Sequence, residues 1–163
     1  MKSIIAVGAV LLAGFVDPAF AGCGNGPSYL TQAQVNTILA SNFACGRSTA
    51  VNAPGWNEKH SAAPGGIVVE QHDPGAADDE NVGPWNTANV GGRGQVTYSY
   101  GAGGTPVYEI ATAANGNCNA GAGTCTTLPA IYQFCGVGGG APAVLNILVT
   151  AALPALSTCP SNP

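Results

Sequence analysis

The stretch Gln95-Val-Thr-Tyr-Ser-Tyr100 alternates strictly between polar and apolar or aromatic side chains. Every second residue from Val96 to Tyr100 falls on one face of an extended chain, and the residues between them fall on the other. This alternation is typical of a half-buried β-strand. Ala102-Gly103-Gly104 then forms a turn, and Val107-Tyr108-Glu109-Ile110 resumes the extended pattern. Together these segments predict a β-hairpin.

Other short extended segments lie on both sides of this hairpin, separated by breaks rich in Gly, Pro and Asn. Regular strands joined by short loops predict a mainly β fold, an antiparallel meander that closes as a barrel or folds as a sandwich. The segments expected to be strands are residues 56–61, 66–72, 84–89, 95–100, 106–112, 130–135 and 144–151.

One short helix is expected near the N-terminus of this domain. Thr31-Gln-Ala-Gln34 has the residue types of a capping box, in which two side chains satisfy backbone N–H groups at the start of a helix. Apolar residues then recur at helical spacing between Val35 and Leu39, until Asn42 and Gly46 interrupt the pattern.

Residues 1–21 have the pattern of an export signal: Lys2 is followed by an apolar run and then by the small-residue cleavage pattern Ala19-Phe20-Ala21. The apolar run is too short to cross a bilayer, which takes about 20 helical residues. We therefore expect a single mature domain, Gly22–Pro163, that is secreted or held at the cell surface, with the periplasm as the alternative compartment. No later segment predicts a transmembrane helix.

A lipid anchor is the alternative to simple export, because Phe20-Ala21-Gly22-Cys23 is close to a lipoprotein cleavage motif. Phe at the first position of that motif is atypical. Lipidation of Cys23 would also leave an odd number of cysteines in an oxidising compartment. The sequence therefore favours ordinary signal cleavage.

The composition of the chain excludes a nucleic-acid-binding protein. The chain has 4 basic and 8 acidic residues, a formal net charge of −4, and only 7% charged residues. So few cations cannot form the basic surface that a nucleic acid requires.

Alanine dominates the 46% of residues that are hydrophobic, so the core is expected to be thin. Stability should then come partly from cross-links or from neighbouring subunits.

The six cysteines allow 15 complete disulfide pairings. The flexible segment between the two middle cysteines favours a local bridge, and the remaining cysteines would tie the end of the helix to a late strand and join the two termini. The expected pairs are Cys118–Cys125, Cys45–Cys135 and Cys23–Cys159. A zinc site is the alternative, but paired C-x-x-C units are missing.

The chain resembles a group of uncharacterised small secreted bacterial β-rich proteins over roughly residues 30–135. The resemblance implies a compact antiparallel β domain tied by a helix-to-strand disulfide, and it implies no activity. After the helix, it is carried by Cys45, Trp56-Asn-Glu-Lys-His60, Gly65-Gly66, Gly83-Pro-Trp85, Val96-Thr-Tyr98-Ser-Tyr100-Gly101, Tyr108 and Tyr132-Gln-Phe134-Cys135.

Two pairs of ionisable residues are candidates for chemistry. Glu58 with His60, and Glu70 with His72, each place a carboxylate two residues from an imidazole, so that both project to one face of a strand. If the two strands pair, the four side chains could bind Zn²⁺ or Cu²⁺, or supply a general base. The preferred interpretation is that they form the polar, solvent-facing side of a sheet.

A second cluster of carboxylates follows in a glycine-containing loop, formed by Asp73, Asp78, Asp79 and Glu80. Clustered oxygens on a flexible chain suit Ca²⁺, although their spacing differs from that of the common calcium-binding loop. A solvated acidic turn is the preferred interpretation. The sequence predicts no cofactor.

The sequence favours a non-catalytic, extracellular structural protein that assembles with copies of itself into a filament, coat or matrix. A thin core and a weakly charged surface both suit burial against identical subunits. The apolar segment near the C-terminus is expected either to close the sheet or to pair with a neighbouring subunit. Its candidate assembly residues are Val144, Leu145, Ile147, Leu148 and Val149.

The alternative function is a binding module, a small β-barrel that holds an apolar ligand or displays aromatic side chains to a glycan. Trp56, Trp85 and the tyrosines would line such a pocket. Aromatic residues in a sheet more often form its core. A secreted enzyme that uses His60 or His72 is a third and weaker hypothesis, because the chain lacks a recognisable nucleophile or metal triad.

Overall fold

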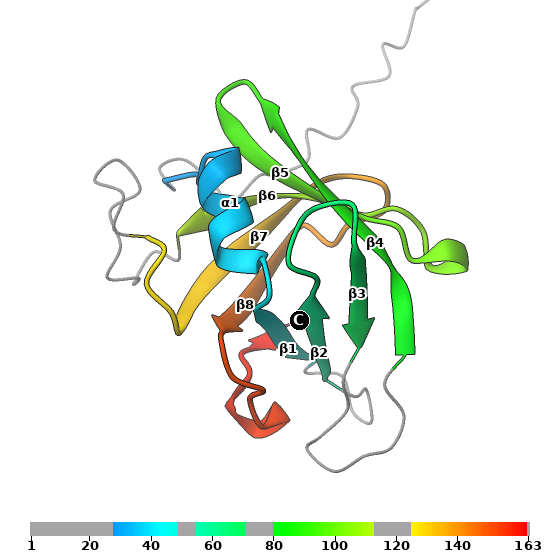
Figure 1. Cartoon of the computed structure of the whole chain (residues 1–163), viewed down its shortest axis with the longest axis vertical. Helices are drawn as coiled ribbons and strands as arrows, with labels where there is room; N and C mark the ends of the chain where they lie inside the picture. Colours follow the sequence, from blue (N-terminus) through cyan, green and yellow to red (C-terminus); the bar gives the residue numbers. More distant parts are fainter. Residues whose placement is uncertain (1–27, 49–54, 71–79, 113–124, 163) are drawn as a thin grey trace, which may run out of the picture.

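The computed structural model describes residues 28–48, 55–70, 80–112 and 125–162. Eight antiparallel strands each pair with the next along the chain, and the last pairs with the first (Figure 1). The predicted meander is therefore confirmed, and it closes as a barrel. The strands are β1 (Phe43–Ser48), β2 (Trp56–His60), β3 (Ile67–Glu70), β4 (Glu80–Val90), β5 (Arg93–Tyr98), β6 (Val107–Thr112), β7 (Ala130–Gly138) and β8 (Val144–Thr150).

The predicted helix is α1, Gln32–Leu39, and it starts with the capping box that the sequence indicated. The Gln34 backbone N–H donates to the Thr31 hydroxyl at 3.3 Å, and the Thr31 backbone N–H donates to the Gln34 side chain at 2.9 Å. Two short 3-10 helices, η1 (Gly101–Gly103) and η3 (Leu156–Thr158), complete the described helices. None of the described helices is long and apolar enough to cross a membrane.

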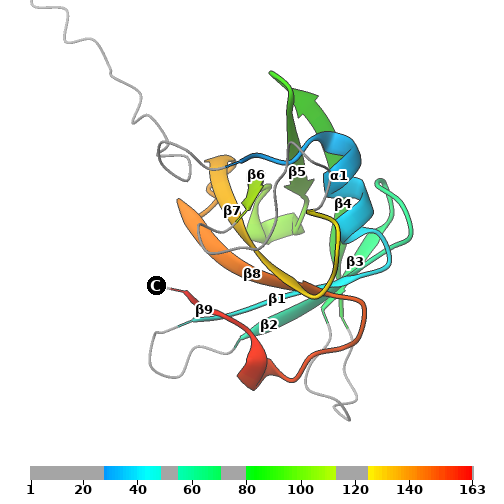
Figure 2. The ribbon, with the colours of Figure 1, turned by 90° about the vertical axis from the view of Figure 1, so that its left-hand side faces the viewer.

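Helix α1 lies against one end of the barrel (Figures 1 and 2). The Gln32 side chain donates to the Thr87 carbonyl of β4 at 3.1 Å. The segment before the helix also pairs with the barrel, because the Leu30 carbonyl accepts from Gly94 at 2.7 Å and its N–H donates to Ile110 at 2.8 Å. These contacts close the end of the barrel at which β4 ends and β5 begins.

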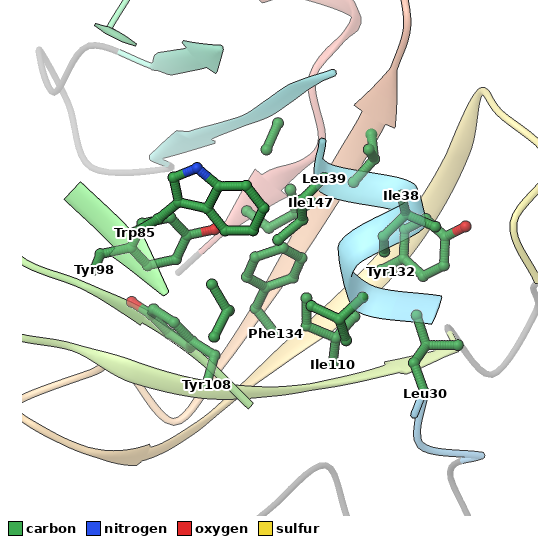
Figure 3. Packing of buried hydrophobic residues seen from close by; sticks show 14 of the residues in the cluster. Leu30, Ile38, Leu39, Trp85, Tyr98, Tyr108, Ile110, Tyr132, Phe134 and Ile147 are labelled. Carbon is green, nitrogen blue, oxygen red and sulfur yellow. The ribbon is translucent and has the colours of Figure 1, made fainter. Parts of the chain in front are cut away.

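The core fills the helix-covered half of the barrel interior. Val35, Ile38 and Leu39 of α1 are fully buried. Figure 3 shows Ile38 and Leu39 in the same cluster as barrel side chains, which include Trp85 and Phe134. Aromatic side chains thus supply much of the bulk that the alanine-rich composition lacks.

Strand β1 corrects the expectation that Cys45 marks the end of the helix, because α1 ends at Leu39. Cys45 lies in this strand and forms a disulfide with Cys159, across 114 residues of sequence. The predicted pairs Cys45–Cys135 and Cys23–Cys159 are therefore wrong. The side chain of Cys45 points out of the barrel, toward the C-terminal segment that packs over β1, rather than toward β7. Cys135 is also disulfide-bonded. Cys23 and Cys118, and with them the predicted Cys118–Cys125 bridge, lie outside the described residues.

The apolar C-terminal segment is the closing strand of the barrel. Strand β8 pairs with β7 on one side and with β1 on the other. After η3 the chain returns to β1 as the short parallel strand β9, Ser161–Asn162. The buried Asn162 side chain accepts from the Asn146 N–H at 2.6 Å and donates to the Asn146 carbonyl at 3.0 Å. This amide binds β8 much as another strand would.

Candidate functional site

The interior face of β2 carries the residues that the sequence assigned to a polar surface. Asn57 and Lys59 point outward, and Asn57 is covered by the C-terminal segment, where its side chain donates to the Pro154 carbonyl at 3.0 Å. Trp56, Glu58 and His60 occupy the alternate positions, which face the barrel interior. The solvent-facing interpretation of Glu58 and His60 is therefore wrong.

A cavity of about 190 Å³ lies inside the end of the barrel that α1 does not cover. The parts of β5 and β6 that line the cavity lie at the opposite ends of these strands from the parts that α1 and Leu30 contact. Its inner walls are buried, whereas Trp56, Glu58, Tyr100 and Leu145 at its rim are partly exposed. The lining residues are Ala44, Trp56, Glu58, Tyr98, Tyr100, Tyr108, Phe134, Leu145 and Ile147.

Small residues of β1 create this space. Ala44 pairs with Glu58 across the sheet, and Gly46 pairs with Trp56. A Cβ atom at Gly46 would lie 2.5 Å from the Trp56 ring, so the indole packs directly over the glycine backbone. A larger side chain at either β1 position would project into the cavity or displace its aromatic wall.

Among the described residues that line the cavity, Glu58 supplies the carboxylate, and the others are aromatic or aliphatic. The Tyr100 hydroxyl donates to both of its oxygens, at 2.9 and 3.1 Å. Glu58 and Tyr100 also line an adjoining recess of about 390 Å³, together with Glu80, Asn81 and Val82. Val82 occupies a bulge in β4, where the register with β3 shifts.

The phenols around the cavity are held in their neutral form. Burial, and after it the negative charge of Glu58, raises the pKa of Tyr108 to about 12. Burial, followed by the Glu58 charge, also raises the pKa of Tyr98 and Tyr100. The charge of one carboxylate thus acts on three tyrosines that line the cavity.

His60 belongs to the core below the cavity rather than to its lining. It is 1% exposed, its Nε2 forms a hydrogen bond of 2.9 Å with the Tyr98 hydroxyl, and its ring packs edge-on against Trp85. Burial lowers the pKa of His60 to about 4, so the imidazole is neutral at neutral pH. Its buried position deprives it of the access that a general base needs.

The structure brings together only part of the predicted ionisable clusters. Strands β2 and β3 pair as expected, with Glu58 opposite Glu70 and His60 opposite Val68. Glu70 in turn lies opposite Glu80 in the register of β3 and β4. Among the described residues, no three His, Cys, Asp or Glu side chains are close enough together to hold a metal ion. The other candidates, His72, Asp73, Asp78 and Asp79, lie outside the described residues.

Only some of the aromatic residues that the binding hypothesis placed in a pocket line the cavity. Trp56, Tyr98, Tyr100 and Tyr108 line the cavity, whereas Trp85 is fully buried in the core. Sequence reasoning missed the aliphatic wall from β8 and the small residues of β1. The alternation in Trp56-Asn-Glu58 could have indicated that the carboxylate shares a face with the indole.

Comparisons with protein-family models, with curated proteins and with solved structures find no match for the chain.

Proposed function

We propose that this protein binds one small, largely apolar molecule in the open end of its barrel. The observation that carries the proposal is the cavity of about 190 Å³ with aromatic walls. Eight-stranded barrels have interiors that either fill with side chains or hold one small ligand. In this barrel, side chains fill the helix-covered half and leave space in the other half.

The size of the cavity limits the ligand. An apolar cavity of about 150 Å³ in another protein holds benzene, so this one suits a single ring or an aliphatic group of similar bulk. A polar substituent would reach the rim, where Glu58 and the Tyr100 hydroxyl lie. Ligands of this size are expected to bind with Kd values between about 1 mM and about 1 µM.

The test is a titration with 2-phenylethanol, followed by backbone amide NMR and by tryptophan fluorescence. Shifts should concentrate on the cavity walls, and Trp56→Phe should remove the fluorescence response, because Trp85 is enclosed in the core. Ala44→Leu should weaken binding at least about 10-fold by filling the cavity. Ala88→Leu makes the same change at an exposed position of β4 and should bind normally. Absence of saturable shifts, or equal effects of the two leucines, would refute the proposal.

The proposal includes export from the cell, which rests on residues 1–21 and on the Cys45–Cys159 disulfide, a bond that suits an oxidising compartment. The intact mass of the exported protein tests both export hypotheses. We expect a chain that begins at Gly22 with an unmodified Cys23. A mass increased by a diacylglyceryl group would instead indicate the lipid anchor.

Self-assembly into a filament, coat or matrix stays a prediction. Its proposed assembly strand, β8, uses both edges within the barrel, which weakens the argument for strand addition between subunits. Sedimentation across a wide concentration range tests it: a binding module is expected to remain monomeric, and concentration-dependent polymers would favour the structural role.

A further inference from the structure

We infer that the molecule bound in this cavity carries an ammonium group, which pairs with Glu58 while its apolar part packs against the aromatic walls. The inference rests on the proposed function and specifies the ligand class. Its first observation is the composition of the walls. Among the described residues that line the cavity and the recess, the charged ones are Glu58 and Glu80, and none is a lysine or an arginine.

The position of Glu58 orients the ligand. Tyr100 donates to both carboxylate oxygens, which fixes the group at the boundary between the cavity and the adjoining recess. An amine that enters from the recess therefore meets the carboxylate first. Its apolar part can then continue into the cavity, toward Phe134 and Ile147. A charge-assisted hydrogen bond at this boundary would fix the depth of the ligand.

The aromatic walls also favour a cation. Ring faces attract an ammonium group within about 6 Å, more strongly as water is excluded. Tyr98 and Tyr100 are stacked, with ring centroids 5.5 Å apart, and Tyr98 and Tyr108 meet edge to face at 6.2 Å. The Glu58 charge, which adds to the effect of burial in raising the pKa of these phenols, acts in the opposite sense on a bound cation and attracts it. An anionic ligand would meet the same field as repulsion.

The expected ligands are thus primary amines attached to one aromatic ring or to a compact aliphatic group. The cavity limits the apolar part to about the bulk of one ring, and the recess of about 390 Å³ leaves room for a longer or branched polar end. This class differs from neutral aromatic compounds and from aromatic acids in one group only, so an isosteric series can test it.

The experiment compares 2-phenylethylamine, 2-phenylethanol and phenylacetate, titrated into the full mature chain at pH 7 by calorimetry and NMR. The amine should bind at least about 10-fold more tightly than the alcohol, and phenylacetate should bind most weakly. Glu58→Gln should reduce the preference for the amine over the alcohol to less than about 2-fold.

Glu109→Gln is the matched control, because it removes the same charge from the outer face of β6. Glu109 there accepts from Arg93 at 2.8 Å and lines neither the cavity nor the recess. The control should keep the preference for the amine. Equal binding of amine and alcohol by the unmodified protein would overturn the inference and leave the binding proposal intact. Failure of all three compounds to bind would instead overturn the proposed function, and with it this inference.

Discussion

Glu58 and His60 lie two residues apart on β2 and face the same interior, yet their surroundings give them different chemistry. Glu58 reaches the partly exposed rim and accepts one bifurcated hydrogen bond from the Tyr100 hydroxyl. His60 lies deeper, between Trp85 and Tyr98. The alternation of the sequence correctly placed both residues on one face. It could not show that this face is interior, because a polar face of a sheet usually meets water.

The buried imidazole should make stability depend on pH. The pKa of His60 is about 4 in the folded chain and about 6.5 in an unfolded chain. The unfolded state therefore binds more protons between these values, so stability is complete above about pH 6.5 and falls as the pH decreases toward 4. His60 alone should account for a loss of about 3 kcal/mol. Urea unfolding at a series of pH values measures it.

His60→Gln is the informative variant for this dependence, since an amide can still hydrogen-bond the Tyr98 hydroxyl but does not titrate. Carboxylates titrate in both proteins, so the difference between their stability profiles isolates His60. The variant should lose less stability between pH 6.5 and 4. Parallel profiles would show that the imidazole is already protonated, or is hydrated, in the folded protein.

Gly46 should determine the shape of the pocket wall. A methyl group at this position would meet the Trp56 ring at 2.5 Å, so Gly46→Ala must displace the indole. We expect tryptophan fluorescence to shift and 2-phenylethanol to bind about 10-fold more weakly. Gly138→Ala is the control, because a Cβ atom there has no neighbour within 4 Å. Normal binding by Gly46→Ala would mean that Trp56 does not form the wall.

At the scale of elements, the seven predicted strands match β2 to β8, and sequence reasoning missed β1 and the two-residue β9. Of these two, β1 belongs to the barrel. Its residues Ala44, Cys45 and Gly46 are small and have weak intrinsic preference for strands. Tertiary structure requires them, because Ala44 and Gly46 face bulky partners on β2. Barrel closure therefore depends on a segment whose local sequence does not indicate a strand, and the sequence alone could not distinguish a barrel from a sandwich.

The capping box of α1 was visible in the sequence because its contacts are local. Thr31→Ala removes the hydroxyl that accepts from Gln34 and should lower the free energy of unfolding by about 1 kcal/mol. Thr37→Ala makes the same substitution at an exposed position of the same helix, where alanine has the better helix propensity and the effect should be neutral or slightly stabilising. Urea unfolding of both variants measures the difference, and equal values would contradict the role of the cap.

At the scale of the whole molecule, the C-terminal segment returns across the outside of the barrel and is tied to its first strand. Cys159 is joined to Cys45, and the Arg47 side chain donates to the Cys159 carbonyl at 2.7 Å. No local pattern encodes this return, which is why the predicted partners of Cys45 and Cys159 were wrong. Strand alternation does explain it afterwards: Cys45 must point outward if Ala44 points into the cavity.

Removal of the Cys45–Cys159 disulfide should therefore change stability without changing the pocket. The bond closes a loop of more than one hundred residues, for which the chain-entropy model gives a stabilisation of about 4 to 5 kcal/mol. Cys45→Ala with Cys159→Ala should lower the free energy of urea unfolding by about this amount. Binding of 2-phenylethanol should persist under native conditions, because the eight strands close the barrel through their own pairing. If binding is lost while the variant remains folded, the disulfide also shapes the cavity, through Ala44 or Gly46 of the same strand.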